Sequence, residues 1–281
     1  MKVWTKVQVV LDKVPVDWSL YTEVFERFGI SNTEQKDNLP ALEGYLSEKK
    51  STSSILDSLK ESFLKNGAKE VIFTSVPEED WAESWKQFFH AKEVGNHFMI
   101  CPSWDVADAS ADRRLIVLDP GQVFGTGEHP TTRMCLELME TIPVEGRSVI
   151  DVGCGSGILS IAAALLGAKS VVGVDVEPES VEATKENAAR NQVSVAVHEG
   201  KGFDPITKDQ NFDVVVSNII SPVILLLIPE VKSSLRTGGY WLVSGIIEAN
   251  WPNVFSALTD AGFKCMAQKQ EGEWIAATFQ H

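Results

Sequence analysis

The sequence lacks the features that mark several large classes of protein. Its 281 residues include four cysteines, Cys101, Cys135, Cys154 and Cys265, and no C-x-x-C pair. A zinc site or a disulfide framework is therefore not expected, and this use of cysteine is typical of a reducing cytoplasm. Apolar runs are short, since residues 223–228 are only six in a row and a membrane-spanning helix needs about 20. The first residues also lack the apolar core of a signal peptide, so we expect a cytoplasmic protein without a membrane anchor.

Positive charge is scarce as well. The chain has 25 lysines and arginines against 39 aspartates and glutamates, a net charge of −14. Direct binding of nucleic acid is therefore not expected, whereas a basic protein partner is favoured by electrostatic steering. The alternative is that the acidity only keeps the protein soluble. The composition is otherwise that of a globular protein, 44% hydrophobic, and the length allows one large domain or two smaller ones.

The most informative segment runs from Asp151 to Gly157, with the sequence D-V-G-C-G-S-G. The apolar, β-branched run at 148–151 predicts a buried parallel strand. Gly153 and Gly155 allow a tight turn and a close approach of the backbone to a ligand. The following run, residues 158–166, predicts a helix. Strand, glycine turn and helix together are typical of a nucleoside-binding crevice.

A second apolar strand, at residues 170–174, brings Asp175 to its carboxyl end, where acidic side chains accept hydrogen bonds from ribose hydroxyls. A dinucleotide site has the fingerprint G-x-G-x-x-G, but Ile158 stands where its third glycine would be. With Asp151 just before the glycines, the pattern favours a ligand without pyrophosphate. We therefore predict the S-adenosylmethionine site of a methyltransferase. A glycine-rich turn without a ligand and a nicotinamide dehydrogenase are the alternatives.

A smaller patterned unit precedes this region. Its spacing predicts a βαββαβ order, a small split sheet with helices on one side, and it has no catalytic signature, which favours recognition or assembly. The expected elements are residues 3–11, 18–28, 31–35, 42–47, 53–64 and 68–75. We predict a substrate-recognition domain at 1–76, a connecting helix or linker at 77–94 and a methyltransferase domain at 95–281. Trp81, Trp85 and Phe88 share one face of that helix, either to dock it on a neighbouring domain or to contact substrate.

Strands alternate with helices in the larger part of the chain. This order predicts an α/β fold with a doubly wound, seven-stranded methyltransferase sheet and a terminal hairpin as an antiparallel edge. Strands are expected at 98–104, 115–118, 148–151, 170–174, 194–198, 212–216, 240–244, 263–268 and 274–279, helices near 131 and at 158–166, 180–191, 229–235 and 251–261, and a turn at 237–239.

The segment 119–132, D-P-G-Q-V-F-G-T-G-E-H-P-T-T, is the second concentrated signal. A helix that begins near Thr131 places Thr132 at its positive amino end, where the threonine can hold the carboxylate of a methionine group. Alternatively, Thr131 and Thr132 only cap that helix. His129 is a candidate base, although a histidine beside a proline in a turn is more often structural.

Asn218 follows a buried strand of the same sheet, so its amide is expected at the mouth of the crevice. Methyltransferases that modify planar amide or base nitrogens carry Asn/Asp-Pro-Pro-aromatic here, whereas this chain has N-I-I-S-P at 218–222. The difference favours an aliphatic amine as acceptor, with Asn218 as the catalytic residue that orients it. The alternative is an asparagine that caps the next helix.

These motifs resemble those of the bacterial methyltransferases of large-subunit ribosomal protein eleven, the PrmA-type protein lysine methyltransferases. The matching segments span most of the chain, and the Phe-Gly-Thr-Gly loop is the most specific of them. Glu128 and Ser221 depart from the pattern, at positions where relatives often have threonine and alanine. The segments are residues 81–86, 101–104, 118–121, 124–127, 129–132, 151–157, 218–220 and 242–246.

The resemblance implies an N-terminal domain that grips the ribosomal protein, a flexible connection, and a catalytic domain that trimethylates lysine side chains and the α-amine of that substrate. It also implies a set of cofactor contacts in this chain, with Asp151 and Gly155 expected in the turn that positions the methionine end, and no metal. A methyltransferase for a lysine of a different protein and an inactive S-adenosylmethionine-binding module are the alternatives. The implied contacts are Thr132, Gly153, Asp175 and Asn218, supported by the loop Phe124, Gly125, Thr126 and Gly127.

Overall fold

The computed structural model describes residues 3–15, 18–30, 33–35, 40–47, 51–77, 90–106, 113–119, 127, 129–207 and 209–281. The chain divides into two compact units, Met1–Phe88 and Phe89–His281. None of the helices formed by the described residues has the length and hydropathy needed to cross a bilayer. The predicted helix that carries Trp81, Trp85 and Phe88 lies outside the described residues.

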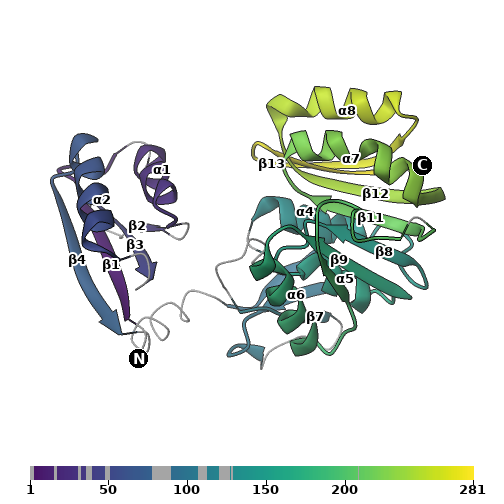
Figure 1. Cartoon of the computed structure of the whole chain (residues 1–281), viewed down its shortest axis with the longest axis horizontal. Coiled ribbons are helices and arrows are strands. Elements are labelled where there is room, and N and C mark those ends of the chain that lie inside the picture. Colours follow the sequence, from purple (N-terminus) through teal and green to yellow (C-terminus); the bar gives the residue numbers. More distant parts are fainter. Residues whose placement is uncertain are drawn as a thin grey trace. The chain divides into compact units, whose positions relative to one another are not determined.

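The first unit has the predicted βαββαβ order. Its four antiparallel strands lie in the order β2-β3-β1-β4, and both helices pack on one face of the sheet (Figure 1). The rings of Phe25 and Phe63, one from each helix, are 4.7 Å apart over this face. Gly44 lies beneath them, where an added Cβ would come within 2.7 Å of Ile30. The elements are β1 Val3–Val10, α1 Ser19–Arg27, β2 Thr33–Gln35, β3 Ala41–Ser47, α2 Ser53–Lys65 and β4 Glu70–Pro77.

The second unit is built on a seven-stranded sheet in the order β10-β9-β8-β11-β12-β14-β13. The five strands β10, β9, β8, β11 and β12 run parallel to one another. Strand β14 runs antiparallel to both of its neighbours, β12 and β13. The strands are β8 Ser148–Val152, β9 Ser170–Asp175, β10 Ala196–Glu199, β11 Phe212–Asn218, β12 Leu235–Ile247, β13 Lys264–Glu271 and β14 Trp274–Gln280. The predicted doubly wound α/β fold with a small N-terminal α+β domain is therefore confirmed.

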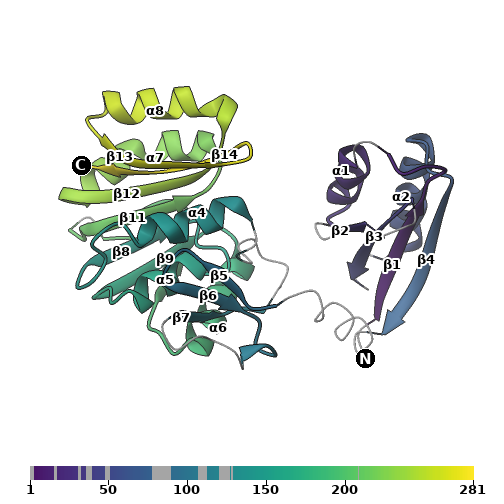
Figure 2. The same ribbon diagram turned by 180° about the vertical axis from the view of Figure 1, so that it is seen from behind.

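Helices cover both faces of this sheet (Figure 2). Three of them, α4 Pro130–Met139, α5 Ile158–Leu165 and α6 Pro178–Arg190, share one apolar core with the sheet. The other two, α7 Ser221–Ser234 and α8 Trp251–Asp260, share the core of the opposite face. The short 3-10 helix η3, Glu248–Asn250, leads from β12 into α8.

A separate three-stranded sheet adds β5 Lys92–Val94 to the two strands expected near 98 and 115, which are β6 Phe98–Cys101 and β7 Arg114–Val117. The sequence gives little sign of β5, because two of its three residues are exposed and charged. The side-chain amide of Asn191, at the end of α6, donates to the carbonyl of Val117 and accepts from its N–H, at 2.8 and 2.7 Å. These bonds hold the end of β7 against the end of α6, a helix that covers the larger sheet.

Two predicted boundaries are wrong. Helix α7 begins at Ser221 rather than at Pro229, which lies in its third turn. Pro229 has no N–H to donate, but the burial of Ile224, Leu227 and Val231 against the sheet outweighs that missing bond. The expected turn at 237–239 is an irregularity within β12, marked by Gly238 at a φ of 77° and a register shift beside it.

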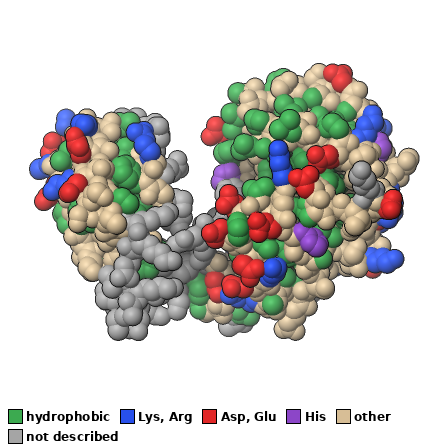
Figure 3. Space-filling view, viewed as in Figure 1, with side chains coloured by type: hydrophobic (Ala, Val, Ile, Leu, Met, Phe, Trp, Pro, Cys, Tyr) green, Lys and Arg blue, Asp and Glu red, His purple; other side chains and the backbone are tan. Residues whose placement is uncertain are grey.

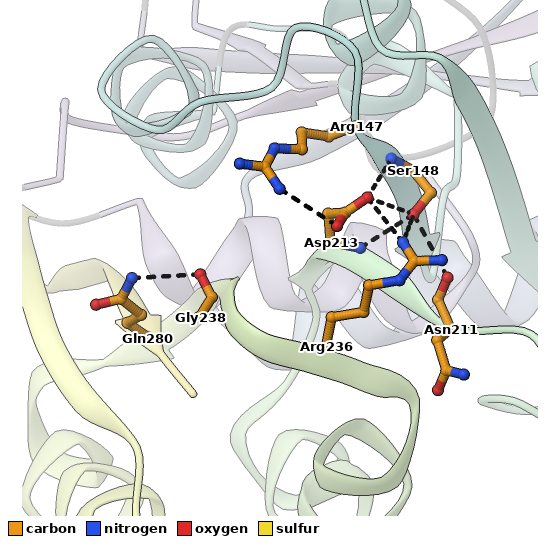
Figure 4. Close-up of polar contacts among 7 residues, drawn as sticks. All are labelled: Arg147, Ser148, Asn211, Asp213, Arg236, Gly238 and Gln280. Carbon is orange, nitrogen blue, oxygen red and sulfur yellow. Dashed lines mark hydrogen bonds and ion pairs between the residues drawn. The ribbon is translucent and has the colours of Figure 1, made fainter.

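The amino ends of the strands are tied together by Asp213 (Figure 4). Its Oδ2 accepts the N–H and the hydroxyl of Ser148, at 2.9 and 2.8 Å, and a guanidinium N–H of Arg236, at 2.8 Å. Arg147 adds a longer ion pair of 3.5 Å. Burial alone would raise the pKa of Asp213, but these hydrogen bonds together hold it below its ordinary value. This network joins β8, β11 and β12 at the edge of the sheet opposite the candidate site.

Candidate active site

Three polar residues lie on one face of the sheet, toward its carboxyl edge. The alternation along β8 turns Ile150 and Val152 toward α7, so Asp151 faces the side of α4 and α5. Asp151 is level with Gly173 of β9 and Val216 of β11. Asp175 and Asn218 are therefore each two residues nearer the edge, on the two strands that flank β8. At about 4.8 Å per strand, these rim residues are roughly 10 Å apart, with Asp151 between and below them.

The glycine turn after β8 needs its glycines. Gly153, Gly155 and Gly157 have φ angles of 80°, 54° and 80°, a region that side-chain-bearing residues rarely adopt. An added Cβ at Gly153 would lie 2.4 Å from Cγ2 of Ile219, in the loop after β11. The bare backbone therefore lets the loops after β8 and β11 approach each other closely.

Helix α6 holds the glycine turn in place through two side-chain hydrogen bonds. The Thr184 hydroxyl donates to the carbonyl of Gly155 at 2.8 Å, and the Asn187 amide donates to the carbonyl of Ser156 at 2.9 Å. Both side chains are buried. Sequence reasoning missed them, although two polar residues three apart on the buried side of an amphipathic helix are a usable signal.

Asp175 lies at the carboxyl end of β9, as predicted, and its carboxylate accepts two backbone N–H groups. Its Oδ2 accepts the N–H of Gly155 at 2.8 Å, and its Oδ1 accepts the N–H of Glu177 at 3.0 Å. The carboxylate thereby fixes the glycine turn and the loop after β9 together. Each oxygen keeps further acceptor capacity, which suits the two hydroxyls of a ribose.

Asp151 is buried at the base of the cleft, with 1% of its surface exposed. The Ser160 hydroxyl donates to its Oδ2 at 2.7 Å, whereas Oδ1 has no hydrogen-bond partner among the described residues. Burial raises the pKa of Asp151 to about 7; the hydrogen bonds with Ser160 oppose this rise and the charge of Asp175 adds to it. A buried acceptor without a partner costs about 1–3 kcal/mol, so Oδ1 is suited to receive a cationic donor from a ligand.

Thr132 and Asn218 meet across the cleft. Thr132 is fully buried in the first turn of α4, and the Asn218 amide nitrogen lies 3.5 Å from its hydroxyl oxygen. The Asn218 Oδ1 is buried without a partner among the described residues. The alternative that Asn218 caps α7 is wrong, because the residue at that cap is Ile220. Asn218 therefore presents an acceptor oxygen to a ligand beside the amino end of α4.

His129 is the cap of α4, so the alternative that the threonines cap it is wrong. The His129 Nδ1 accepts the N–H of Thr131 at 3.3 Å and lies 2.7 Å from its hydroxyl. The ring packs edge-to-face on Trp274, with centroids 4.9 Å apart. Burial lowers the pKa of His129 and the charge of Arg133 adds to this, which keeps Nδ1 available as an acceptor.

The loop after β11 lies directly on β12. The Ile219 N–H donates to the carbonyl of Ser244 at 3.1 Å, and an added Cβ at Gly245 would be 2.5 Å from the Ile219 carbonyl oxygen. Gly245 is thus required for the path of the loop that follows Asn218. Gly245 lies in the segment 242–246, which matches the family motifs but had no role assigned from the sequence.

Gly127 ends the Phe-Gly-Thr-Gly loop close to the cleft. Its φ is 85°, and an added Cβ would lie 2.5 Å from Ile100 and 3.2 Å from Ile158, the first residue of α5. Phe124, Gly125 and Thr126 lie outside the described residues.

The described part of the chain contains no group of three His, Cys, Asp or Glu side chains suited to a metal ion. Cys154 of the turn is buried, which raises its pKa to about 12, and burial also raises that of Cys135. Neither thiol is poised as a nucleophile.

The chemistry of these neighbouring residues fits S-adenosylmethionine. Asp175 can accept from ribose hydroxyls, and the partnerless Oδ1 of Asp151 suits an ammonium. The amino end of α4 beside Thr132 suits a carboxylate. The cofactor carries all three groups, and the turn at Gly153 brings bare backbone to the same place.

Comparisons with known proteins also indicate a methyltransferase. A family model described as ribosomal protein L11 methyltransferase (PrmA) matches residues 12–281. The chain is 36% identical to a ribosomal protein L11 methyltransferase of Clostridium perfringens (strain SM101 / Type A) over 253 residues, 87% of this chain and 80% of that protein. It is 42% identical to one of Clostridium botulinum (strain Eklund 17B / Type B) over 200 residues, 71% and 63% of the two chains. A crystal structure of a ribosomal protein L11 methylase from Lactobacillus delbrueckii subsp. bulgaricus matches 68% of this chain and 98% of its own, with a TM-score of 0.64 and 36% identity.

Fold and site together define an S-adenosylmethionine-dependent methyltransferase of the doubly wound α/β class. The chain belongs to the ribosomal protein L11 methyltransferase (PrmA) family, which confirms the resemblance of its motifs.

Proposed function

We propose that this protein transfers methyl groups from S-adenosylmethionine to amines of ribosomal protein L11, both lysine side chains and the α-amine. The observation that carries the proposal is the family match over residues 12–281, which includes every residue of the cleft. Charge supports it too: residues 89–281 carry 24 aspartates and glutamates against 14 lysines and arginines, a net charge of −10. Such a unit attracts a basic protein substrate.

The cofactor would be held by groups from four parts of the fold. Asp175 would accept from the ribose, and Gly153 and Gly155 would bring backbone against the adenosyl end. Asp151 would accept from the ammonium of the methionine end through Oδ1. Thr132 would bind its carboxylate at the start of α4. We also propose that the loop from Phe124 to Gly127 supports this set.

When bound, S-adenosylmethionine supplies a methyl group that its sulfonium charge already activates. The protein's task is then to present a neutral amine in line with that group. A lysine ammonium has a pKa of about 10.4 and must first lose a proton to solvent, which a dry site beside a positive charge favours. The Asn218 Oδ1 has no partner among the described residues and can accept an N–H of the amine, which orients its lone pair. No strong base is required, and His129 is already engaged as the cap of α4.

We propose that residues 1–76 grip the ribosomal protein, that residues 77–94 connect this recognition domain to the catalytic domain, and that residues 95–281 carry the chemistry. A ribosomal protein as substrate also leads us to propose a cytoplasmic reaction. The first unit is a four-stranded sheet covered by two helices, and its described residues contain no group of side chains suited to a metal ion; both observations fit a role in recognition.

The direct test is methylation of purified L11 with labelled S-adenosylmethionine, read by mass spectrometry. We expect label on L11 and a loss of about 100-fold or more in kcat for Asn218→Ala, because the amine loses its orienting acceptor. Asn211→Ala is the matched control, since Asn211 is an exposed asparagine just before the other end of the same strand. Label on other proteins but not on L11 would contradict the proposed substrate.

A further inference from the structure

Exposed apolar side chains gather near the cleft. Among the described residues, the large apolar side chains with the greatest exposure are Leu226 at 66%, Ile220 at 65% and Val176 at 58%. Val176 directly follows Asp175, and Ile220 is two residues beyond Asn218. Single exposed apolar residues are common on any surface, but two of these three adjoin Asp175 and Asn218 in the sequence, and Leu226 lies further along the helix that Ile220 precedes.

Helix α7 extends this apolar surface away from the mouth. Its buried residues Ile224, Leu227 and Val231 face the sheet. The exposed Pro222, Leu226 and Pro229 recur at intervals of four and three on the outer side, and Ile220 precedes them at the cap. At 1.5 Å per residue the row reaches about 12 Å along the helix. Figure 3 shows apolar side chains gathered over the part of the larger unit where α7 and α8 lie.

We propose that Ile220, Pro222, Leu226 and Pro229, here called the α7 strip, form a docking surface for the ribosomal protein substrate beside the acceptor site. The inference rests on the proposed function and deepens it, because it assigns the substrate a contact on the catalytic unit in addition to the recognition domain.

The position of the strip argues for the substrate as its occupant. Ile220 belongs to the short loop that follows Asn218, and Ile219 anchors this loop on Ser244 and Gly245. An amine on a folded protein reaches Asn218 only if the body of that protein covers the surrounding rim. The strip begins at this rim, so a bound substrate lies over its first residues.

Charge and size argue against a second copy of the chain. Two copies would each bring a net charge of −14 to the contact, whereas a basic ribosomal protein brings the opposite sign. A stable dimer interface also takes roughly 20–30 residues per partner, and the strip has four. A small apolar contact within a larger substrate interface fits both facts.

The test compares Leu226→Ser with Met266→Ser. Met266 is a matched control because it is 46% exposed in the same unit but lies on β13, the edge strand at the far end of the sheet. Methylation kinetics are measured with intact L11 and with a short peptide that carries one acceptor lysine. We expect Leu226→Ser to raise KM for L11 about tenfold, as for an interface residue that matters. Its kinetics on the peptide and its cofactor affinity stay unchanged, and Met266→Ser matches the unaltered chain.

Ile220→Ser is a second variant in which the same rise is expected, and thermal unfolding checks that both variants fold. An unchanged KM for L11 in both variants would overturn the docking surface while leaving the proposed function intact. Sedimentation that shows a dimer lost in Leu226→Ser would assign the strip to a second copy and overturn it too. Failure of the unaltered chain to methylate L11 would instead overturn the proposed function, and the substrate's docking surface with it.

Discussion

Asp151→Asn probes the buried carboxylate at the base of the cleft. The pKa of Asp151 is raised to about 7 by burial, whereas an unfolded chain has an aspartate pKa of about 3.9. Each unit of difference corresponds to about 1.4 kcal/mol, so the gap of about three units corresponds to about 4 kcal/mol. Because the pKa is raised in the folded state, this stability is fully present below pH 4. It is lost as the pH rises to about 7, since only the unfolded chain releases the proton readily in that range.

The asparagine of the variant carries no such proton, so Asp151→Asn lacks this pH dependence. We expect the free energy of unfolding of the unaltered chain, relative to Asp151→Asn, to fall by an amount on the order of 4 kcal/mol between pH 4 and pH 8. The measurement is denaturant unfolding of the catalytic unit in both proteins at unit steps of pH. All other carboxyl groups are common to both proteins and cancel in the difference. A difference that stays constant across this range would refute the assignment of a proton to Asp151.

The same carboxylate links cofactor binding to pH. If its Oδ1 accepts the ammonium of S-adenosylmethionine, the ionised form binds better. Affinity should then rise with pH up to about 7 in the unaltered chain and stay flat in Asp151→Asn. Calorimetry at pH 5.5 and 8 measures the cofactor affinity of both proteins. The same change of affinity with pH in both would show that Asp151 does not bind the ammonium.

Substitutions at three further residues test other parts of the structure. Asp175→Ala should weaken cofactor binding at least tenfold, because both the ribose acceptor and the anchor of the Gly155 N–H are lost; unchanged affinity in calorimetry would exclude Asp175 from the site. His129→Ala should destabilise the start of α4 by about 1 kcal/mol and raise KM for the cofactor, whereas His129→Asn, which keeps a capping acceptor, should restore both; equal behaviour of the two variants would argue against the cap. Asp213→Ala should lower the free energy of unfolding by about 1–3 kcal/mol and leave KM unchanged, because the Ser148 N–H loses its bond to the carboxylate and Arg236 keeps only its bond to the Ser148 hydroxyl; a changed KM would show that the two edges of the sheet are coupled.

The alternation of apolar residues was enough to predict the fold. The inner strands β8, β9, β11, β12 and β14 contain buried apolar residues in runs, whereas the edge strands β10 and β13 are mostly exposed. The spacing between the glycine turn and Asp175 indicated that β8, α5 and β9 form one strand–helix–strand unit. The start of α7 was mispredicted because Pro229 is a strong local signal for a helix start, and only tertiary burial of its neighbours overrides it. Strand β5 is too short and too polar to show a pattern.

The positions of the candidate site residues in the fold were also predictable, but not their hydrogen-bond partners. Asp151, Asp175 and Asn218 stand at strand ends, which the sequence reveals. The cap of α4 is His129 rather than a threonine because of the path by which the chain enters the helix, and the sequence does not reveal this path. The support of the turn by Thr184 and Asn187 depends on packing between α6 and the loop. Predictions for residues 78–89 and 124–126 stay predictions, because these residues lie outside the described structure.

A crystal structure of this chain with S-adenosylmethionine would test the central claim most directly. We expect the ribose at Asp175, the methionine ammonium at Oδ1 of Asp151 and the methyl group facing Asn218. Density for the cofactor elsewhere in the molecule, or a cleft between β8 and β11 that excludes it, would contradict the account.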